Sequence, residues 1–405
     1  MMTQAQLPSN DAASKGQAPA GTSNSTNIAI QSLHAFRDGV ISRIERSCDG
    51  PWWLARSTLF CVLLSLFFAF PNLNHTYQGS RARATVEKIQ DLHKFWSNLT
   101  PQSPEHFRVV AYRITVELIA HTFGFGIRGC FALHALSGAV LIAALLTLAN
   151  RIFGDKVIAT LLTAAASTSY AGASAFLEVR ANFDGIALLL VVLAMLTRQP
   201  LFIAALVVMS GFTDERGVVA AGFVFLWWAM QVTFKAQNWK SFLPPLAVIA
   251  GCVAYLAIRL TIQSKYGLRW ETGNFAPFGL LNNGLMGIWS GLEGLWFPVG
   301  LGVIIAIRRR LWWLCVSTAM VAAVIVCGAI SVADMTRSMI YLLPCVFIAA
   351  KLLREDSDNK CLRNFFFIAA VISVIWPGYY VGGKSTVWLM YPLPVQLLRF
   401  MLKLA

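Results

Sequence analysis

Three short segments of this chain combine carboxylates with an arginine inside otherwise apolar sequence. In chain order their charged residues are Glu178, Arg180 and Asp184; Asp214, Glu215 and Arg216; and Asp334 and Arg337. An arginine presents a rigid fork of N–H donors that suits phosphate, and it keeps its charge when partly buried. A carboxylate can act as a general base or bind a divalent cation such as Mg²⁺ or Mn²⁺. A pocket that contains both types predicts a substrate with phosphate and hydroxyl groups.

Each cluster also has a structural interpretation, in which its members pair with one another and fix the ends of helices. A single exposed ion pair adds little stability, whereas ionisable groups at a membrane boundary tend to be paired, hydrated or functional. For any one cluster the structural interpretation is favoured. All three are predicted on the same side of a membrane, and this favours a shared polar cavity.

The elements that must position these residues are membrane helices. Of 405 residues, 57% are hydrophobic and 13% are charged, against about 25% charged in soluble proteins. Apolar runs approach the length of about 20 residues that crosses a bilayer. The predicted fold is an all-α, polytopic transmembrane helical bundle of about eleven spans. The predicted spans are 53–70, 129–149, 156–172, 184–197, 200–212, 217–231, 242–262, 286–307, 311–330, 338–353 and 362–380.

The chain is predicted to have three regions. Residues 1–51 are polar and read as a disordered cytoplasmic tail. Residues 52–385 form the bundle and include a long extracytoplasmic loop, 71–128. Residues 386–405 are apolar and either lie in the interface or form a twelfth span.

Basic residues orient the predicted spans. One set of alternate loops holds twelve, namely Arg151, Lys156, Arg198, Lys235, Lys240, Arg308, Arg309, Arg310, Lys351, Arg354, Lys360 and Arg363. The opposite short loops hold five, namely Arg180, Arg216, Lys265, Arg269 and Arg337. The positive-inside rule places the first set, with the N-terminus, in the cytoplasm. Basic loops also account for the net charge of +14, so nucleic acid is not a predicted partner.

The long outer loop carries two amphipathic patterns and further acids. One apolar stripe consists of Ile89, Leu92, Phe95 and Trp96, and a second pattern of helical spacing covers 107–123. Both favour helices that lie in the outer interface, although they would equally suit a lid that packs over the bundle. The eight Cys and six His lack the spacing of a metal site, so no metal site and no definite cofactor are predicted.

The plan resembles the GT-C class of multi-pass glycosyltransferases, which use polyprenyl-phosphate-linked sugars. The shared features are a cytoplasmic N-terminus, a long first outer loop with interfacial helices, and short hairpin spans with charged outer turns. The stretch Glu178–Trp228 is most similar to that class in its pattern of apolar and charged residues. The segment ADMTR, which precedes a Pro-containing span, is also similar to it. The resemblance implies transfer from a polyprenyl-linked sugar to a glycan, glycolipid or membrane lipid of the cell envelope. It also implies location in the inner (plasma) membrane.

One departure from that family concerns the catalytic base. Such enzymes usually carry an acid soon after the first span, whereas this chain reads PNLNHTYQG there. If the resemblance holds, the base comes from the loop or from the span boundaries, and the candidates are Glu87, Asp91, Glu105, Asp184 and Asp214. The candidates for stabilising the leaving phosphate are Arg180, Arg216 and Arg337. Substrate binding would also involve Glu178, Glu215 and Asp334.

Three other functions fit the same sequence. A polysaccharide polymerase-like protein would also transfer glycans, but between two lipid-linked chains. A transporter or flippase of lipid-linked glycans would place an ionisable group near the bilayer midplane, and Glu293 inside the eighth predicted span is the residue that favours it. In a non-catalytic assembly subunit, the clustered charges would be incidental.

Overall fold

A computed structural model describes most of the chain. The described residues are 22–68, 80–177, 181–232, 239–268, 284–332, 334–376, 379–382, 385–388, 398 and 401–402. The chain divides into two compact units, Met1–Arg43 and Ile44–Ala405.

Helix α1 (Thr22–Cys48) begins in the first unit. It lies within the segment 1–51 that the sequence predicts to be disordered, and the structure differs from that prediction over these residues. Within the polar composition of this segment, the apolar side chains of Leu33, Phe36 and Val40 recur at helical spacing, every three or four residues. Leu33 and Phe36 are exposed.

The second unit is almost entirely helical in its described residues, as the sequence predicts. Its helices are α2 (Trp53–Phe68), α3 (Ser80–Gln90), α4 (Leu92–Asn98), α5 (Glu105–Val109), α6 (Thr115–Phe123), α7 (Ile127–Phe153), α8 (Lys156–Thr168), α9 (Tyr170–Leu177), α10 (Asp184–Leu196), α11 (Pro200–Thr213), α12 (Arg216–Ala229), α13 (Leu243–Tyr266), α14 (Gly284–Leu292), α15 (Trp296–Arg308), α16 (Trp312–Ser331), α17 (Met335–Met339), α18 (Leu343–Asp356) and α19 (Asn359–Ile375). Short 3₁₀ turns precede α13, α15 and α18. An antiparallel hairpin of β1 (Tyr379–Gly382) and β2 (Ser385–Trp388), which the sequence did not predict, pairs Tyr379 with Trp388.

Five helical stretches are long and apolar enough to cross a membrane. They are Ile127–Phe153, Trp239–Tyr266, Gly284–Arg308, Trp312–Ser331 and Met335–Asp356. The other six predicted spans overlap shorter helices, α2, α8, α10, α11, α12 and α19. At about 1.5 Å of rise per residue, the 13 residues of α10 give about 20 Å. The count of about eleven spans therefore stays a prediction.

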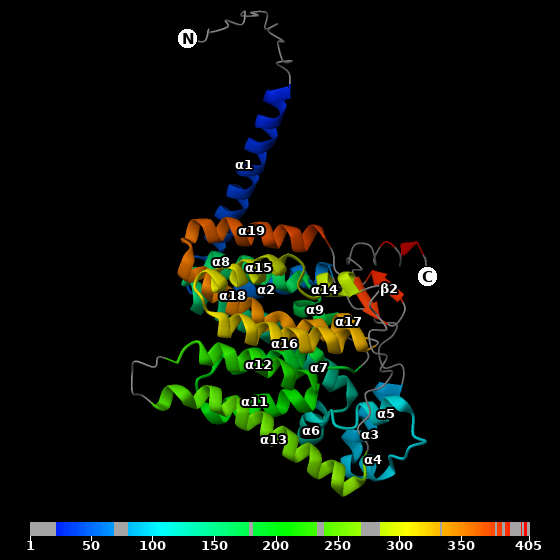
Figure 1. The fold of residues 1–405 in the computed structure, drawn as a ribbon. Helices are drawn as coiled ribbons and strands as arrows, with labels where there is room; N and C mark the ends of the chain where they lie inside the picture. The colour runs from blue at the N-terminus through cyan, green and yellow to red at the C-terminus, as the bar shows by residue number, and fades with distance from the viewer. Residues whose placement is uncertain are drawn as a thin grey trace, which may run out of the picture. The chain divides into compact units, whose positions relative to one another are not determined.

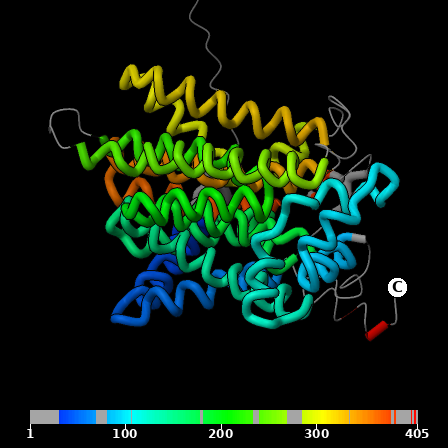
Figure 2. Tube along the Cα trace, turned by 90° about the horizontal axis from the view of Figure 1, so that it is seen from below, coloured from blue at the N-terminus to red at the C-terminus, as the bar shows by residue number. Residues whose placement is uncertain are grey.

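The helices of the second unit run side by side, with α3 to α6 at one end of them (Figures 1 and 2). The β hairpin lies toward the same end in Figure 1, where β1 packs against α14 and α17. Helix α10 packs against α7, α11 and α12. Almost every side chain of α8 and α10 is buried, which is expected because these helices are apolar nearly all round. Helix α18 is buried along its apolar first part, whereas its charged last turn is exposed. In contrast, α13 and α16 expose large apolar side chains such as Val253, Leu256, Val316 and Met320. Such faces suit contact with lipid.

Helices α3 to α6 pack against the bundle. Phe95 and Trp96 of the predicted apolar stripe are buried in a cluster with Phe212 of α11 and Tyr255 of α13. The indole nitrogen of Trp96 donates a hydrogen bond to the carbonyl oxygen of Ala111 at 2.8 Å. The stripe therefore faces the protein core, as in the lid interpretation of this loop. Whether these helices also lie in a membrane interface stays a prediction.

A buried ion pair fixes α3 against α6. The ammonium nitrogen of Lys88 lies 2.5 Å from Oε1 of Glu117, and it also donates hydrogen bonds to the carbonyl oxygens of Val110 and Arg113. Burial lowers the pKa of Lys88, and the adjacent Glu117 carboxylate only partly offsets this. The pair holds the loop in the position from which it reaches the charged residues described next.

Candidate functional site: a buried network of acids and arginines

The structure joins side chains from all three acid–arginine segments. Asp184 is the first residue of α10, Arg216 the first residue of α12, and Arg337 lies in α17. Arg337 donates to both carboxylate oxygens of Asp184, with Nε–Oδ2 at 2.6 Å and Nη2–Oδ1 at 2.9 Å. Arg216 Nη2 lies 3.4 Å from Asp184 Oδ1. Residues that are 153 positions apart in sequence therefore share one bidentate pair.

The backbone that places Asp184 is strained. Ala181 and Phe183 have φ values of 62° and 50°, in the left-handed region that residues other than glycine seldom adopt. Between them, the side-chain oxygen of Asn182 accepts a hydrogen bond from Arg81. Asp184 itself is 0% exposed. Strain of this kind is maintained only where the surroundings compensate for it, and here it directs a carboxylate toward two guanidinium groups.

Asp214 forms the second buried anchor, in the tight turn between α11 and α12. Its carboxylate accepts from Arg216 at 2.5 Å (Nη2–Oδ2) and 2.7 Å (Nε–Oδ1), and Arg113 Nη1 lies 3.2 Å away. Burial raises the pKa of Asp214, but the positive charges of Arg113 and Arg216 outweigh burial and hold it well below the usual range. This carboxylate is therefore ionised, and it orients two arginines.

The network has a more open edge around Asp334, which precedes α17. The Asp334 side chain is 28% exposed, and its Oδ2 accepts from Arg337 Nη1 at 2.6 Å. Arg81 Nη2 lies 3.5 Å from the same oxygen, and the Tyr380 hydroxyl donates to Oδ1 at 2.8 Å. Burial raises the pKa of Asp334, but the charges of Arg337 and Arg81 outweigh it and the net pKa is lowered.

Two arginines of the long loop complete the network. Arg81 comes from α3, and Arg113 lies between α5 and α6. Arg113 makes a bidentate pair with Glu215, at 3.1 Å (Nε–Oε2) and 2.8 Å (Nη2–Oε1). Neither arginine was a candidate in the sequence, because its partner lies more than 100 positions away. Tyr380, whose hydroxyl donates to Asp334, also had no local sequence pattern that could have identified it.

The network is electrically balanced in its described residues. Four guanidinium groups, of Arg81, Arg113, Arg216 and Arg337, face four carboxylates, of Asp184, Asp214, Glu215 and Asp334. Mutual neutralisation limits the cost of placing charges within an apolar bundle. In this state the ion pairs therefore fasten the ends of α10, α11, α12 and α17 together. A phosphate that reached the open edge would compete with the carboxylates for the same N–H donors.

The remaining predicted site residues lie elsewhere. Glu178 and Arg180 are outside the described residues. Glu87 is exposed on α3, Asp91 caps α4 by accepting from the backbone nitrogen of Lys94, and Glu105 begins α5. Within the described part of the chain, no hydrogen bond or ion pair joins these three loop acids to the network.

The donor set of the described residues does not form a metal site. No group of three or more His, Cys, Asp and Glu side chains suited to a metal ion occurs in the described ranges. The network carboxylates accept guanidinium hydrogen bonds instead, so a divalent cation would have to displace arginines from them. The suggestion that they hold Mg²⁺ or Mn²⁺ stays a prediction.

No family model, curated protein or solved structure matches this chain.

Proposed function

We propose that this chain is a multi-pass membrane glycosyltransferase. It would move a sugar from a polyprenyl-phosphate donor to a glycan or lipid of the cell envelope, with about eleven spans in the inner membrane and a cytoplasmic N-terminus. The observation that supports this most directly is the joining of three distant acid–arginine segments with two loop arginines in one network. Clustered arginines of this kind suit the phosphate of a lipid-linked donor, and an adjacent carboxylate can accept a proton.

The lengths of the helices support a site recessed from the membrane surface. Helices α10, α11 and α12 have 13, 14 and 14 residues, or about 20 Å, against a hydrocarbon core of about 30 Å. Their charged ends, at Asp184, Asp214 and Arg216, therefore fall short of one boundary. A lipid-linked phosphate resides at that boundary, so its sugar would approach the open edge of the network.

The exposure of the carboxylates supports a division of roles. Asp184 and Asp214 are fully buried against guanidinium groups, so they act as positioning residues that orient Arg216 and Arg337. Asp334 is partly exposed and becomes the base. Arg81 and Arg216, at 24% and 20% side-chain exposure, would hold the donor phosphate. The sequence assigned Asp334 to binding and Asp184 and Asp214 to catalysis, and the proposal exchanges these roles.

Donor binding would also activate the base. In the unliganded network, the arginines hold the pKa of Asp334 low, and a carboxylate with a low pKa is a weak base. A phosphate that draws Arg81 away removes part of this effect, and the pKa of Asp334 rises. The hydroxyl oxygen of the acceptor then bonds to the anomeric carbon, and Asp334 takes the proton that this hydroxyl loses. The bond from that carbon to the phosphate oxygen breaks, and polyprenyl phosphate leaves with the electron pair.

A complementation experiment tests this function. Surface glycans and glycolipids from a deletion strain are compared by mass spectrometry after rescue with the normal chain, with Asp334→Asn, or with Asp49→Asn as a matched control. Asp49 is exposed and lies outside the network. We expect the deletion strain and Asp334→Asn to lack one sugar unit while the control restores it. Full glycans with Asp334→Asn at normal protein level would refute the role of Asp334.

The same spectra separate the competing functions. Shortened chains with intact sugar units would indicate a polymerase. Complete precursor that accumulates at the cytoplasmic face would indicate a flippase. One observation favours transport as the second candidate: Glu293 is fully buried, with φ at 49°, where a 3₁₀ turn interrupts the span between α14 and α15. Broken helices with ionisable residues occur at transport sites.

A further inference from the structure

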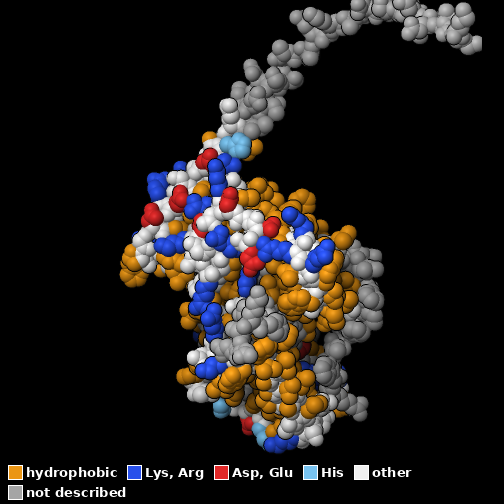
Figure 3. Space-filling model, turned by 60° about the vertical axis from the view of Figure 1, so that its left-hand side comes forward, with side chains coloured by type: hydrophobic (Ala, Val, Ile, Leu, Met, Phe, Trp, Pro, Cys, Tyr) orange, Lys and Arg blue, Asp and Glu red, His pale blue; other side chains and the backbone are white. Residues whose placement is uncertain are grey.

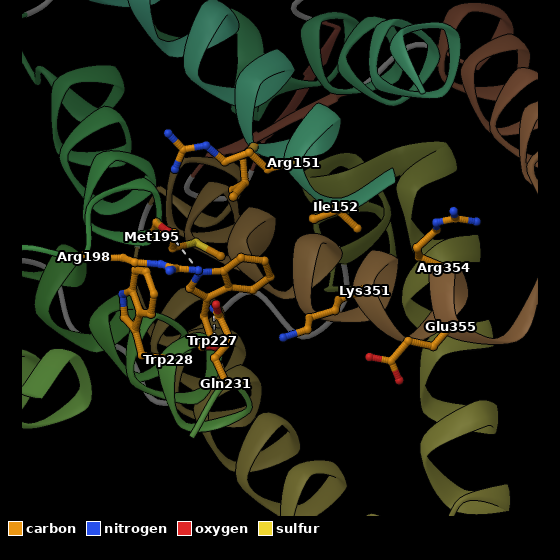
Figure 4. Close-up of a pocket in the computed structure, with 11 residues that line it drawn as sticks. Arg151, Ile152, Met195, Arg198, Trp227, Trp228, Gln231, Lys351, Arg354 and Glu355 are labelled. Carbon is orange, nitrogen blue, oxygen red and sulfur yellow. Dashed lines mark hydrogen bonds between the residues drawn. The ribbon is translucent and has the colours of Figure 1, made fainter. Parts of the chain in front are cut away.

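A second cluster of charge lies at the opposite ends of the helices that carry the network. A cavity of about 280 Å³ opens between the last turn of α7, the α10–α11 turn, the end of α12 and the end of α18. Its basic lining residues are Arg151, Arg198, Lys351 and Arg354, placed around the cavity on three sides (Figure 4). Helix α10 begins at Asp184 in the network and ends beside this cavity, so the two charged regions are one helix length apart.

The cavity carries an excess of positive charge. Its only acidic lining residue in the described part of the chain, Glu355, is already paired with Arg309 at 2.6 Å. Arg151 donates a hydrogen bond to the carbonyl oxygen of Leu196 at 2.6 Å. Within the described ranges no carboxylate pairs with Arg198 or Arg354, and both side chains are exposed. Figure 3 shows a face on which Lys and Arg side chains gather next to hydrophobic surface.

The inner wall of the cavity is apolar and fixed. The indole nitrogens of Trp227 and Trp228 donate hydrogen bonds to the carbonyl oxygens of Met195 and Ala194, at 2.9 and 3.0 Å. Both rings are buried, and the Lys351 ammonium lies over the Trp227 ring, 5.4 Å from its centroid. Leu148, Ile152 and Met195 complete this wall. A basic rim above an apolar wall matches a molecule with an anionic head and a hydrocarbon body.

We propose that this cavity binds the phosphate headgroup of an anionic phospholipid. A free phosphate ion shares the headgroup chemistry, but it would gain nothing from the apolar wall of the cavity. The four basic residues belong to the loops that the positive-inside rule assigns to the cytoplasm, where anionic lipid is attracted to basic clusters. The proposal does not depend on the glycosyl-transfer reaction.

Lipid binding to the purified full chain tests the proposal. The probe is phosphatidylglycerol, titrated in neutral detergent micelles and detected as bound mass by native mass spectrometry, with phosphatidylcholine as the neutral lipid. The test variant removes two charges from the cavity, Arg198→Gln with Arg354→Gln. The control removes two exposed charges from neighbouring loops outside the cavity, Arg310→Gln with Lys360→Gln. Each variant is compared at equal monodisperse yield.

We expect phosphatidylglycerol to bind the cavity variant about 30-fold more weakly than the normal chain, since two basic residues beside an anionic lipid are removed. The control should change binding less than about twofold. Equal weakening in both variants, or unchanged binding in the cavity variant, would overturn the proposal. If the double variant is unstable, Arg198→Gln and Arg354→Gln are measured singly, with about fivefold expected for each.

Inorganic phosphate separates the two sources of the anion. It is added to the normal chain during the lipid titration, at millimolar concentration. Undiminished binding of phosphatidylglycerol supports a lipid site. Displacement of the lipid by phosphate, or equal binding of phosphatidylcholine, would contradict it.

Discussion

Replacing Arg337 with Met should destabilise the chain strongly, because it leaves a buried carboxylate without its main partner. Arg337 is 2% exposed and donates two hydrogen bonds to Asp184, which is 0% exposed. Removing one member of a buried pair costs about 3–5 kcal/mol. Arg216 still reaches Asp184 at 3.4 Å, so we expect a value near the lower end, about 3 kcal/mol.

A double replacement provides the control for this prediction. With Asp184→Asn added to Arg337→Met, no buried charge is left unpaired at this position, and most of the lost stability should return. The assay is unfolding of the full chain by SDS in mixed micelles, followed by circular dichroism, for the normal chain, both single variants and the double variant. Two results would show that the pair is solvated and refute the reasoning. One is a loss of unfolding free energy below about 1 kcal/mol for Arg337→Met; the other is a loss in the double variant equal to the sum of the losses in the two single variants.

Two further predictions follow from the other buried charges. The pKa of the Asp214 carboxyl is lower in the folded chain than in the unfolded chain. Its contribution to stability is therefore complete above the unfolded pKa of about 4, and it is lost as the pH falls toward the pKa of the folded chain. The midpoint of thermal unfolding should therefore drop on acidification, and Asp214→Asn should flatten that dependence; an equally steep profile in the variant would contradict it. Lys88→Met leaves Glu117 buried beside Thr85 and should cost about 3–5 kcal/mol, while Lys88→Met with Glu117→Leu should recover most of it in the same SDS assay. Failure of the double variant to recover would mean that the ion pair does not clamp α3 to α6.

The sequence predicted the helices of the second unit well, because their apolar runs reflect burial and lipid contact directly. It also predicted that acid–arginine segments near residues 184, 214 and 337 would gather on one side, and the structure joins Asp184, Asp214, Arg216 and Arg337. The prediction was made from the predicted alternation of spans across the membrane, and that alternation stays a prediction. It needed no knowledge of which side chains touch.

The parts that the sequence could not predict depend on contacts across the chain. Arg81 and Arg113 lie in a loop whose path is fixed by the burial of Phe95 and Trp96 and by the Lys88–Glu117 pair. Local spacing contains no information about such a path, so the loop acids appeared to be equally good candidates for the base. The sequence also does not show how deeply each carboxylate is buried. In the structure, burial separates Asp184 and Asp214 from the more exposed Asp334.

Cysteine labelling in intact cells tests most directly whether the network faces the compartment outside the cytoplasm. Exposed Cys327 and Cys361 are first replaced by Ser, and a single exposed cysteine is then introduced as Gln90→Cys, at the end of α3, or as Lys360→Cys, at the start of α19. A membrane-impermeant maleimide should label the first variant in intact cells and the second only after permeabilisation. Labelling of Lys360→Cys in intact cells, with Gln90→Cys protected, would place the acid–arginine network in the cytoplasm and contradict the account.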